Sequence, residues 1–171
     1  DPDSGGIYIF TAPPVGDNTG LDWERPASFE YFHAASGVSL QADCGLSLHG
    51  GHSRLPEKSP KHSFRLDFQD DYGPNKLYYP LFGKNQAQDI NSFFLRAGFG
   101  NTWIHQSETE RQQAIYTRDA WAKRTKEAMG HFSSNSNYAH LFLNGMYWGL
   151  YNPNERINDE YMSQYLGGKN E

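Results

Sequence analysis

The sequence predicts an α+β fold, with a mainly antiparallel sheet, one long helix and a short C-terminal helix. Short apolar segments recur between turn-forming residues along most of the chain, which is typical of an antiparallel sheet. The stretch at residues 111–129 is rich in helix formers, lacks glycine and proline, and is followed by Gly130, a normal C-terminal signal. The length of 171 residues suits one domain with a continuous core.

Five strands are expected before the long helix. In the fourth, Phe64, Leu66 and Phe68 share one face, because successive side chains of a strand point to opposite sides. The fifth is apolar enough to be buried, although it contains Arg96. These strands are expected at residues 28–33, 38–43, 46–50, 62–68 and 92–99.

A hairpin and a short helix are expected after the long helix. The pair Asn144 and Gly145 joins two apolar runs, and this pair tolerates the positive φ angles of a type I′ turn. The final helix is expected to have Asn158 or Asp159 as its cap and to end at Gly167. The order of elements is therefore several strands, a helix, a hairpin and a helix.

The N-terminal region differs in composition from the rest of the chain. Residues 1–27 are rich in Pro, Gly and Asp, and we expect them to form an arm that lies on a domain spanning residues 28–171. The chain does not begin with methionine, so we expect a processed or excised piece of a longer protein. Many Tyr, Trp, Asn and Gly with few Lys favour an exported protein, either secreted or at the cell surface.

Composition argues against several kinds of site and partner. The net charge of −5 gives no bulk attraction to nucleic acid, so no nucleic-acid partner is expected. Cys44 is the only cysteine, which excludes an internal disulfide and a cysteine-based zinc site. His49, His52 and His62 match no zinc template, so no metal site is predicted. No apolar run reaches the roughly 18 residues that a transmembrane helix needs.

The stretch HGGHSRLPEKSPKHSFRLDF, residues 49–68, concentrates basic residues around a glycine turn. Backbone N–H groups in such a turn, together with nearby cations, can hold a phosphate. The stretch matches neither a P-loop nor a dinucleotide-binding fingerprint. Taken alone, this pattern is more often a solvated hairpin, so two interpretations stay open.

Lys61 is the residue that we single out, because it leads into an apolar strand that can pack its stem. A buried ammonium needs a carboxylate or phosphate partner, and the long helix offers Asp119 and Glu127 as candidates. Arg96 is expected to pair with a buried carboxylate or to face a ligand, with structural pairing favoured. Glu155 follows the hairpin and is a candidate acceptor at the end of a strand, or an ordinary residue that leads into the helix.

Four segments taken in order make the chain similar to the spore coat protein H (CotH) kinase-like family, from about residue 28 to the C-terminus. They are GLSLHGGHSR…KSPKHSFRLDF, then FFLRAGF, then the expected helix at 114–130, then YAHLFLNGMYWGLYNPNERIND. The most specific part is L-x-L-N-G-x-Y-W-G-L-Y followed by N-E-R. The resemblance implies an atypical protein-kinase-like fold, with this chain as the small, nucleotide-covering lobe and the crossing into the large lobe.

The resemblance also implies roles for the basic stretch. Lys61 takes the place of the kinase lysine that holds the ATP phosphates. His49, Ser53 and Arg54 lie in a stretch that corresponds to the family's R-G-N-S-S-R-like segment, which makes them phosphate-side candidates. This chain has His49 instead of the first Arg and Gly51 instead of Asn, so phosphate contacts transfer less directly to these two positions.

By the same resemblance, the full-length protein uses ATP and Mg²⁺ to phosphorylate Ser or Thr of extracytoplasmic proteins. The catalytic aspartates are expected beyond Glu171, in the remainder of the kinase domain. Phosphoryl transfer depends on such carboxylates and on Mg²⁺. We therefore expect this chain alone to contain no catalytic residue, to require no cofactor and to be inactive.

The alternative is a non-catalytic adhesion or coat module with a kinase-like fold. Exposed aromatic rings pack on sugar faces and anchor protein interfaces, and Trp103, Tyr147 and Trp148 are the candidates. The simpler expectation for most of these rings is that they belong to the core. The protein substrate or partner is not identified by the sequence.

Overall fold

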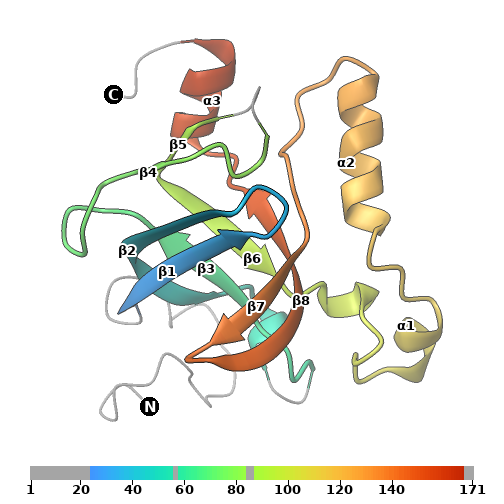
Figure 1. Ribbon diagram of the computed structural model, residues 1–171. Helices are drawn as coiled ribbons and strands as arrows, with labels where there is room; N and C mark the ends of the chain where they lie inside the picture. Colours follow the sequence, from blue (N-terminus) through green and yellow to red (C-terminus); the bar gives the residue numbers. More distant parts are fainter. Residues whose placement is uncertain (1–23, 56–57, 84–86, 168–171) are drawn as a thin grey trace.

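A six-stranded antiparallel sheet forms the body of the structure (Figure 1). The computed structural model describes residues 24–55, 58–83 and 87–167, so nearly all of the expected arm at residues 1–27 lies outside the described residues. The strand order is β1-β2-β3-β6-β8-β7, which makes β1 and β7 the edges. The strands are β1 Arg25–His33, β2 Val38–His49, β3 Ser63–Asp67, β6 Ser92–Arg96, β7 Ala139–Leu143 and β8 Met146–Glu155.

Shorter elements connect and flank this sheet. Two of them pair into a small second sheet, β4 Leu77–Tyr78 and β5 Asp89–Ile90. The helices and helical turns are η4 His52–Arg54, η5 Phe99–Asn101, α1 Glu108–Gln112, α2 Arg118–Ala128 and α3 Asp159–Leu166. Among the described residues, no helix has the length and apolarity to cross a membrane.

β1 and β2 form a long hairpin in place of three expected strands. β1 begins at Arg25, and the segments expected at 38–43 and 46–50 are one continuous strand of 12 residues. β2 runs through Gly45, where a Cβ would lie only 2.1 Å from Glu24 Oε1. This glycine therefore serves close packing and does not form a turn.

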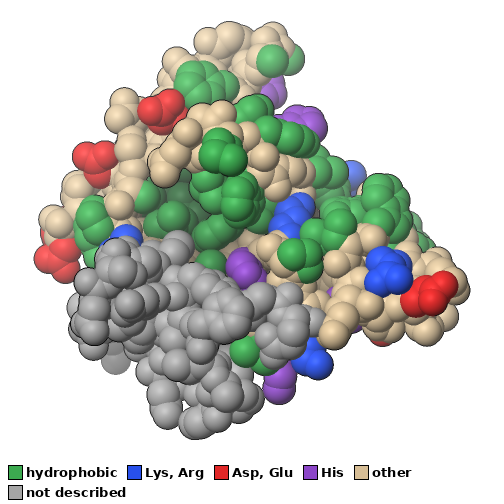
Figure 2. All heavy atoms as spheres, turned by 90° about the horizontal axis from the view of Figure 1, so that it is seen from below, with side chains coloured by type: hydrophobic (Ala, Val, Ile, Leu, Met, Phe, Trp, Pro, Cys, Tyr) green, Lys and Arg blue, Asp and Glu red, His purple; other side chains and the backbone are tan. Residues whose placement is uncertain are grey.

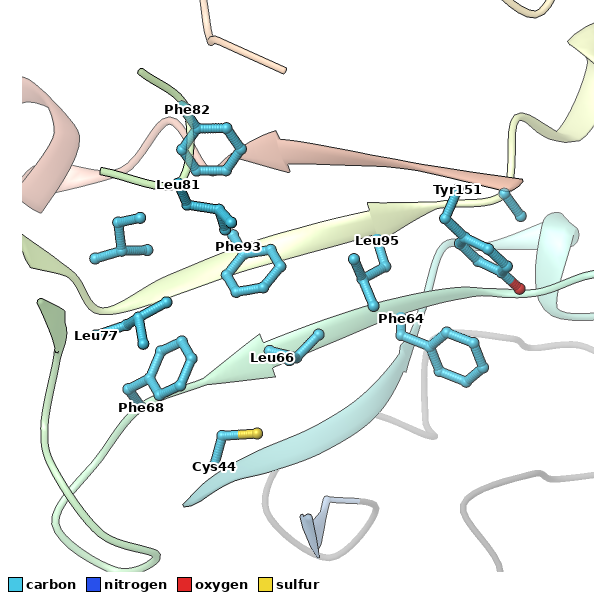
Figure 3. Packing of buried hydrophobic residues seen from close by; sticks show 12 residues of the cluster. Cys44, Phe64, Leu66, Phe68, Leu77, Leu81, Phe82, Phe93, Leu95 and Tyr151 are labelled. Atoms are coloured by element: carbon cyan, nitrogen blue, oxygen red, sulfur yellow. The ribbon is translucent and has the colours of Figure 1, made fainter. Parts of the chain in front are cut away.

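The hydrophobic core lies on one face of the sheet (Figure 3). Phe64 and Leu66 of β3 are 5% and 3% exposed, and Phe68 just after it is 3% exposed, which confirms the predicted face. Phe93 of β6 is fully buried among them. Fully burying an apolar side chain stabilises a fold by about 1.5–3 kcal/mol, so this face supplies much of the stability. Leu77, Leu81 and Phe82, from the segment after β3, cover it.

The prediction of one long helix at residues 111–129 is wrong. The chain forms a five-residue α1 and an eleven-residue α2, separated by residues 113–117. Tertiary contacts stabilise the non-helical segment between α1 and α2. The Tyr116 ring packs 5.0 Å from Trp103, and the Tyr116 carbonyl oxygen accepts a hydrogen bond of 3.0 Å from the Tyr138 hydroxyl. Helix propensity is a weak local preference, and these contacts outweigh it where two β-branched residues already weaken it.

The hairpin and the C-terminal helix are confirmed. Asn144 and Gly145 connect β7 to β8 with φ angles of 49° and 79°, as a type I′ turn requires. The Asn158 side chain accepts a hydrogen bond of 3.0 Å from the Tyr161 N–H at the start of α3. Gly167, at φ 74°, ends the helix.

α2 stands beside the sheet and does not cover its hydrophobic face (Figure 1). Ala120 is the one buried residue of this helix, and Trp121 is 70% exposed. Apolar packing therefore contributes little to the position of α2, which depends on the polar contacts described below.

Candidate functional site

The connection between β2 and β3 brings the basic candidates together. His49 ends β2 and pairs with Ser63 at the start of β3. Ser53 and Arg54 lie in η4 between these strands. The Ser53 carbonyl oxygen lies 3.2 Å from Nδ1 of His62, next to Lys61 in sequence. The four predicted phosphate-side residues, His49, Ser53, Arg54 and Lys61, thus belong to one end of the sheet.

Lys61 lies just before β3, and its side chain turns toward β8. Its ammonium group donates a hydrogen bond to the Leu150 carbonyl oxygen. Nζ lies 4.2 Å from the ring centre of Tyr151 and 5.8 Å from that of Tyr116, distances at which a cation is attracted to an aromatic face. Burial lowers the pKa of Lys61, because desolvation disfavours its charged form.

The structure does not bring the expected carboxylate partners to Lys61. Asp119 of α2 pairs with Arg96 and, at 2.9 Å, with Lys123. Glu127 is exposed near the end of α2. Among the described residues, no carboxylate forms an ion pair with Lys61, so its charge is met by a carbonyl dipole and two rings.

Asp119 joins α2 to the sheet. Its carboxylate accepts a hydrogen bond from the Arg96 guanidinium of β6, which is the structural pairing favoured for Arg96. Lys123, one turn along α2, also donates to Asn154 Oδ1 of β8. Burial lowers the pKa of Lys123, and the hydrogen bond to Asp119 opposes that shift. Two strands therefore hold the helix through charged groups.

Glu155 lies apart from the other candidates and is fully engaged. It is 6% exposed and accepts hydrogen bonds from the Asn135 backbone N–H at 2.7 Å and from Asn135 Nδ2 at 2.8 Å. Its other oxygen accepts from the Tyr165 hydroxyl at 2.6 Å, and burial together with this carboxylate raises the pKa of Tyr165. In this structure Glu155 connects β8 to α3 and to the segment before β7.

A small, open pocket lies beside Glu155, between β5 and α3. Its lining includes Asp89 and Glu160, whose carboxylates both pair with the Lys76 ammonium group, at 3.2 Å and 2.6 Å. Neither Lys61 nor the β2–β3 connection contributes to this pocket. It is therefore separate from the basic candidates.

The polar face of the sheet carries charged residues that have no functional role in the sequence-based prediction. Arg65 and Asp67 lie opposite the apolar residues of β3, and the Arg65 guanidinium donates to Asp67 Oδ1 through Nε at 2.9 Å and Nη2 at 2.5 Å. The alternation of residues 62–68 was the signal that places these side chains on one face. Arg156 Nη1 lies 3.7 Å from the same oxygen, which only the pairing of β6 with β8 reveals.

His49 lies on the same polar face. Its ring stacks on Phe94 of β6, with ring centres 3.9 Å apart and an interplanar angle of 22°. Burial lowers the pKa of His49, and the positive charges of four arginines lower it further. Four arginines therefore lie near enough to His49 to disfavour its charged form. They are Arg65, Arg96, Arg156 and Arg54.

The described part of the chain offers cations for an anion and no ready metal cage. No group of three or more His, Cys, Asp or Glu side chains within residues 24–55, 58–83 and 87–167 is placed to hold a metal ion. A phosphate chain fits the donors at the end of the sheet, since ammonium and guanidinium groups are the usual partners of phosphate oxygens.

Comparison with known proteins identifies the relatives of the chain. The model of a family described as CotH kinase protein matches residues 46–171. A search of curated proteins finds no match. The matched range contains β3 to β8, all three α-helices and the whole connection that carries Lys61.

Proposed function

Because the chain belongs to the CotH kinase family, we propose that it forms the nucleotide side of an atypical protein kinase. In this proposal the full-length protein uses ATP and Mg²⁺ to phosphorylate Ser or Thr of extracytoplasmic proteins, and the chain is secreted or at the cell surface. One observation carries the proposal. Lys61 presents a partly desolvated ammonium group with no carboxylate partner among the described residues, in the same connection between β2 and β3 as Ser53 and Arg54.

An anion beside Lys61 would supply the negatively charged partner that this ammonium group lacks among the described residues. Desolvation disfavours the charged lysine, and a phosphate oxygen favours it far more than a carbonyl dipole does. Phosphoryl transfer proceeds largely through positioning and charge neutralisation, so a fixed cation beside the phosphates contributes directly to the rate. Lys61 and Arg54 would hold the phosphates, and Mg²⁺ would neutralise the charge that develops during transfer. In this proposal the carboxylates for the metal and the base come from beyond Glu171.

Substitution of Lys61 tests the proposal in the full-length protein. Lys61→Met keeps an apolar stem for the Tyr151 ring and removes the charge, so the melting temperature should stay within a few degrees. We expect at least a tenfold loss of Mg²⁺–ATP affinity by calorimetry, since charge-assisted contacts are worth about 1.5–3 kcal/mol. Lys58→Met is the matched control, because Lys58 is exposed in the same connection. Equal ATP affinity in the wild type and Lys61→Met would remove the role assigned to Lys61.

A non-catalytic adhesion module is the second candidate, favoured by the exposure of the aromatic candidates. Trp103, Tyr147 and Trp148 are 68%, 57% and 43% exposed, although most such rings are expected in a core. Hydrophobic side chains also gather at the surface on the underside of the molecule (Figure 2). Flat exposed rings suit the apolar faces of sugars.

Glycan binding discriminates this second candidate from the kinase. Trp103→Ala should abolish binding to cell-surface polysaccharide without unfolding the domain, whereas Trp121→Ala on α2 is the control for loss of an exposed ring. Unfolding of Trp103→Ala, or Mg²⁺–ATP binding in the absence of any glycan binding, argues against the adhesion module.

A further inference from the structure

Tyr151 of β8 lies at the edge of the hydrophobic core, beside Lys61. It is 1% exposed, and the centre of its ring lies 6.0 Å from that of the Phe64 ring (Figure 3). A tyrosine hydroxyl at this depth needs a hydrogen-bond partner. The partner is the His62 carbonyl oxygen, which accepts from the Tyr151 hydroxyl at 2.8 Å. Tyr151 therefore fixes the backbone of the residue that follows Lys61.

The ring of Tyr151 also contacts the tip of the Lys61 side chain. Nζ lies 4.2 Å from the ring centre, well within the distance at which an aromatic face attracts a cation. The carbonyl oxygen of Leu150, the preceding residue of β8, accepts a hydrogen bond from the same Nζ. One segment of β8 therefore holds both the backbone next to Lys61 and the ammonium group of Lys61.

This segment of β8 begins at a glycine that lets its backbone approach Lys61 closely. A Cβ at Gly149 would lie 3.6 Å from Nζ of Lys61 and 3.7 Å from its Cε. Gly149 has a φ angle of 115°, a conformation that residues with a side chain rarely adopt. Glycine at this position therefore keeps the space next to the ammonium group clear of a side chain.

A third residue fixes the backbone of Lys61 itself. Ser59 is 1% exposed, and its hydroxyl donates to the Lys61 carbonyl oxygen at 2.9 Å and accepts from the Lys61 N–H at 3.4 Å. Ordering a long lysine side chain costs conformational entropy. Because the backbone and the tip of Lys61 are both held in the folded protein, a ligand does not have to supply that cost when it binds.

The contacts from β8 hold the ammonium group without neutralising it. A carboxylate would hold a lysine by cancelling its charge, whereas an aromatic face and a carbonyl dipole attract the cation and leave its full charge in place. Among the described residues, Lys61 forms no ion pair with a carboxylate, and its contacts are of the second kind. The positive charge of Lys61 therefore stays available to a ligand.

We infer that Tyr151 is the positioning residue of Lys61, with its ring fixing the ammonium group and its hydroxyl fixing the adjoining backbone. The inference rests on the proposed function, in which Lys61 contacts the ligand. Tyr151 itself is almost fully buried, so it acts on the ligand only through Lys61.

The pKa of Lys61 is the first readout. It is measured in the full-length protein as the rate of acetylation by acetic anhydride against pH, with mass spectrometry to separate Lys61 from Lys58. We expect a pKa below the ordinary lysine value in the wild type, because burial lowers it. Tyr151→Met removes the ring and fills much of its space with a flexible apolar chain. The ammonium group should then move into water, and the pKa of Lys61 should rise toward the ordinary value.

The affinity for Mg²⁺–ATP, measured by calorimetry, is the second readout. We expect Tyr151→Met to weaken it about tenfold and Tyr151→Phe, which keeps the ring, to retain most of it. Phe64→Leu is the matched control, because Phe64 is a buried ring of the same cluster. The double variant Lys61→Met/Tyr151→Met should bind as Lys61→Met alone does, since a positioning residue has no effect once Lys61 is absent.

Three outcomes overturn the inference and leave the proposed function intact. The first is additive losses of ATP affinity in the double variant. The second is a change in Phe64→Leu equal to that in Tyr151→Met, in both the ATP affinity and the pKa of Lys61. The third is an ordinary pKa of Lys61 in the wild type, which would place Nζ in water away from the ring and needs no variant to fold. A lowered pKa that depends on Tyr151, in a protein that does not bind Mg²⁺–ATP, supports the positioning role and contradicts the proposed kinase.

Discussion

Glu24 and Asp67 bring two carboxyl groups close together inside the protein. The two residues are 8% and 6% exposed, and Glu24 Oε1 also accepts from Gln69 Nε2 at 2.6 Å. Oδ2 of Asp67 is buried and has no hydrogen-bond partner among the described residues. The negative charge of Asp67 disfavours the ionised form of Glu24.

The position of Glu24 predicts a stability that falls as the pH rises. Burial and the charge of Asp67 raise the pKa of Glu24, against smaller opposing effects of Tyr72 and Arg65. A group with a raised pKa in the folded state stabilises fully below its ordinary pKa, and the stabilisation is lost as the pH rises through the folded value. The pH range over which this stabilisation is lost therefore begins near the ordinary pKa of Glu and extends toward neutral pH.

Glu24→Gln tests this window. The amide carries no charge, so at neutral and higher pH it removes the cost of a buried carboxylate beside the charge of Asp67. We expect the melting temperature of Glu24→Gln to exceed that of the wild type at pH 8 and the difference to shrink or reverse at pH 4. Parallel curves for the two proteins across this range would contradict a raised pKa of Glu24.

Gly45→Ala is expected to destabilise the hairpin. The added methyl group would lie 2.1 Å from Glu24 Oε1 and 2.6 Å from the Tyr72 ring, and such overpacking costs about 1–3 kcal/mol. Gly51→Ala is the control, because a Cβ at that position has no neighbour within 4 Å. Urea unfolding of both variants measures the difference in stability. Equal midpoints would show that the Glu24 side chain moves aside without loss of stability.

Asp119→Asn is expected to loosen α2 without unfolding the sheet. The substitution weakens the contacts to Arg96 and Lys123, and these side chains are partly exposed, so the cost is about 1 kcal/mol or less. Hydrogen exchange should become faster in α2 and stay unchanged in β3 and β6. Glu127→Gln removes a charge from the same helix without these contacts, and equal exchange in the two variants would argue that Asp119 does not anchor α2.

Tyr165→Phe is expected to destabilise the protein by about 1–3 kcal/mol. The hydroxyl group donates to the buried Glu155 carboxylate and accepts from the partly buried Ala87 backbone N–H, so its loss leaves both groups short of a partner. Tyr147→Phe is the control, since its hydroxyl lies on the exposed hairpin. Thermal unfolding measures both, and an equal small effect would mean that water replaces the Tyr165 hydroxyl.

The elements with strong local signals could be predicted from the sequence, and those set by distant contacts could not. Alternation places Phe64 on the core face, and the Asn144-Gly145 pair fixes the hairpin, because both effects depend on adjacent residues. The prediction of one helix at 111–129 is wrong because Tyr116 contacts Trp103 and Tyr138, which are distant in the sequence. The continuity of β2 through Gly45 depends on Glu24, twenty-one positions earlier.

In the candidate site, too, local features could be predicted from the sequence and distant contacts could not. The basic stretch indicates that His49, Ser53, Arg54 and Lys61 belong together, because the connection between two paired strands is local. The partner of Lys61 is a backbone carbonyl of β8, which has no signature in the sequence. The placement of Arg65, Arg96 and Arg156 on one face requires the order of β3, β6 and β8, which is a property of topology and not of any one segment.

The attachment of α2 through charged groups leaves the orientation of this helix sensitive to its electrostatic surroundings. Ala120 is its one buried residue, so a rotation of α2 relative to the sheet exposes little apolar surface. Dissolved salt screens charge pairs at partly exposed sites and leaves the hydrophobic core intact. The angle of α2 can therefore respond to ionic strength, or to an anion that competes with Asp119 for Arg96, while the strands beneath it keep their register.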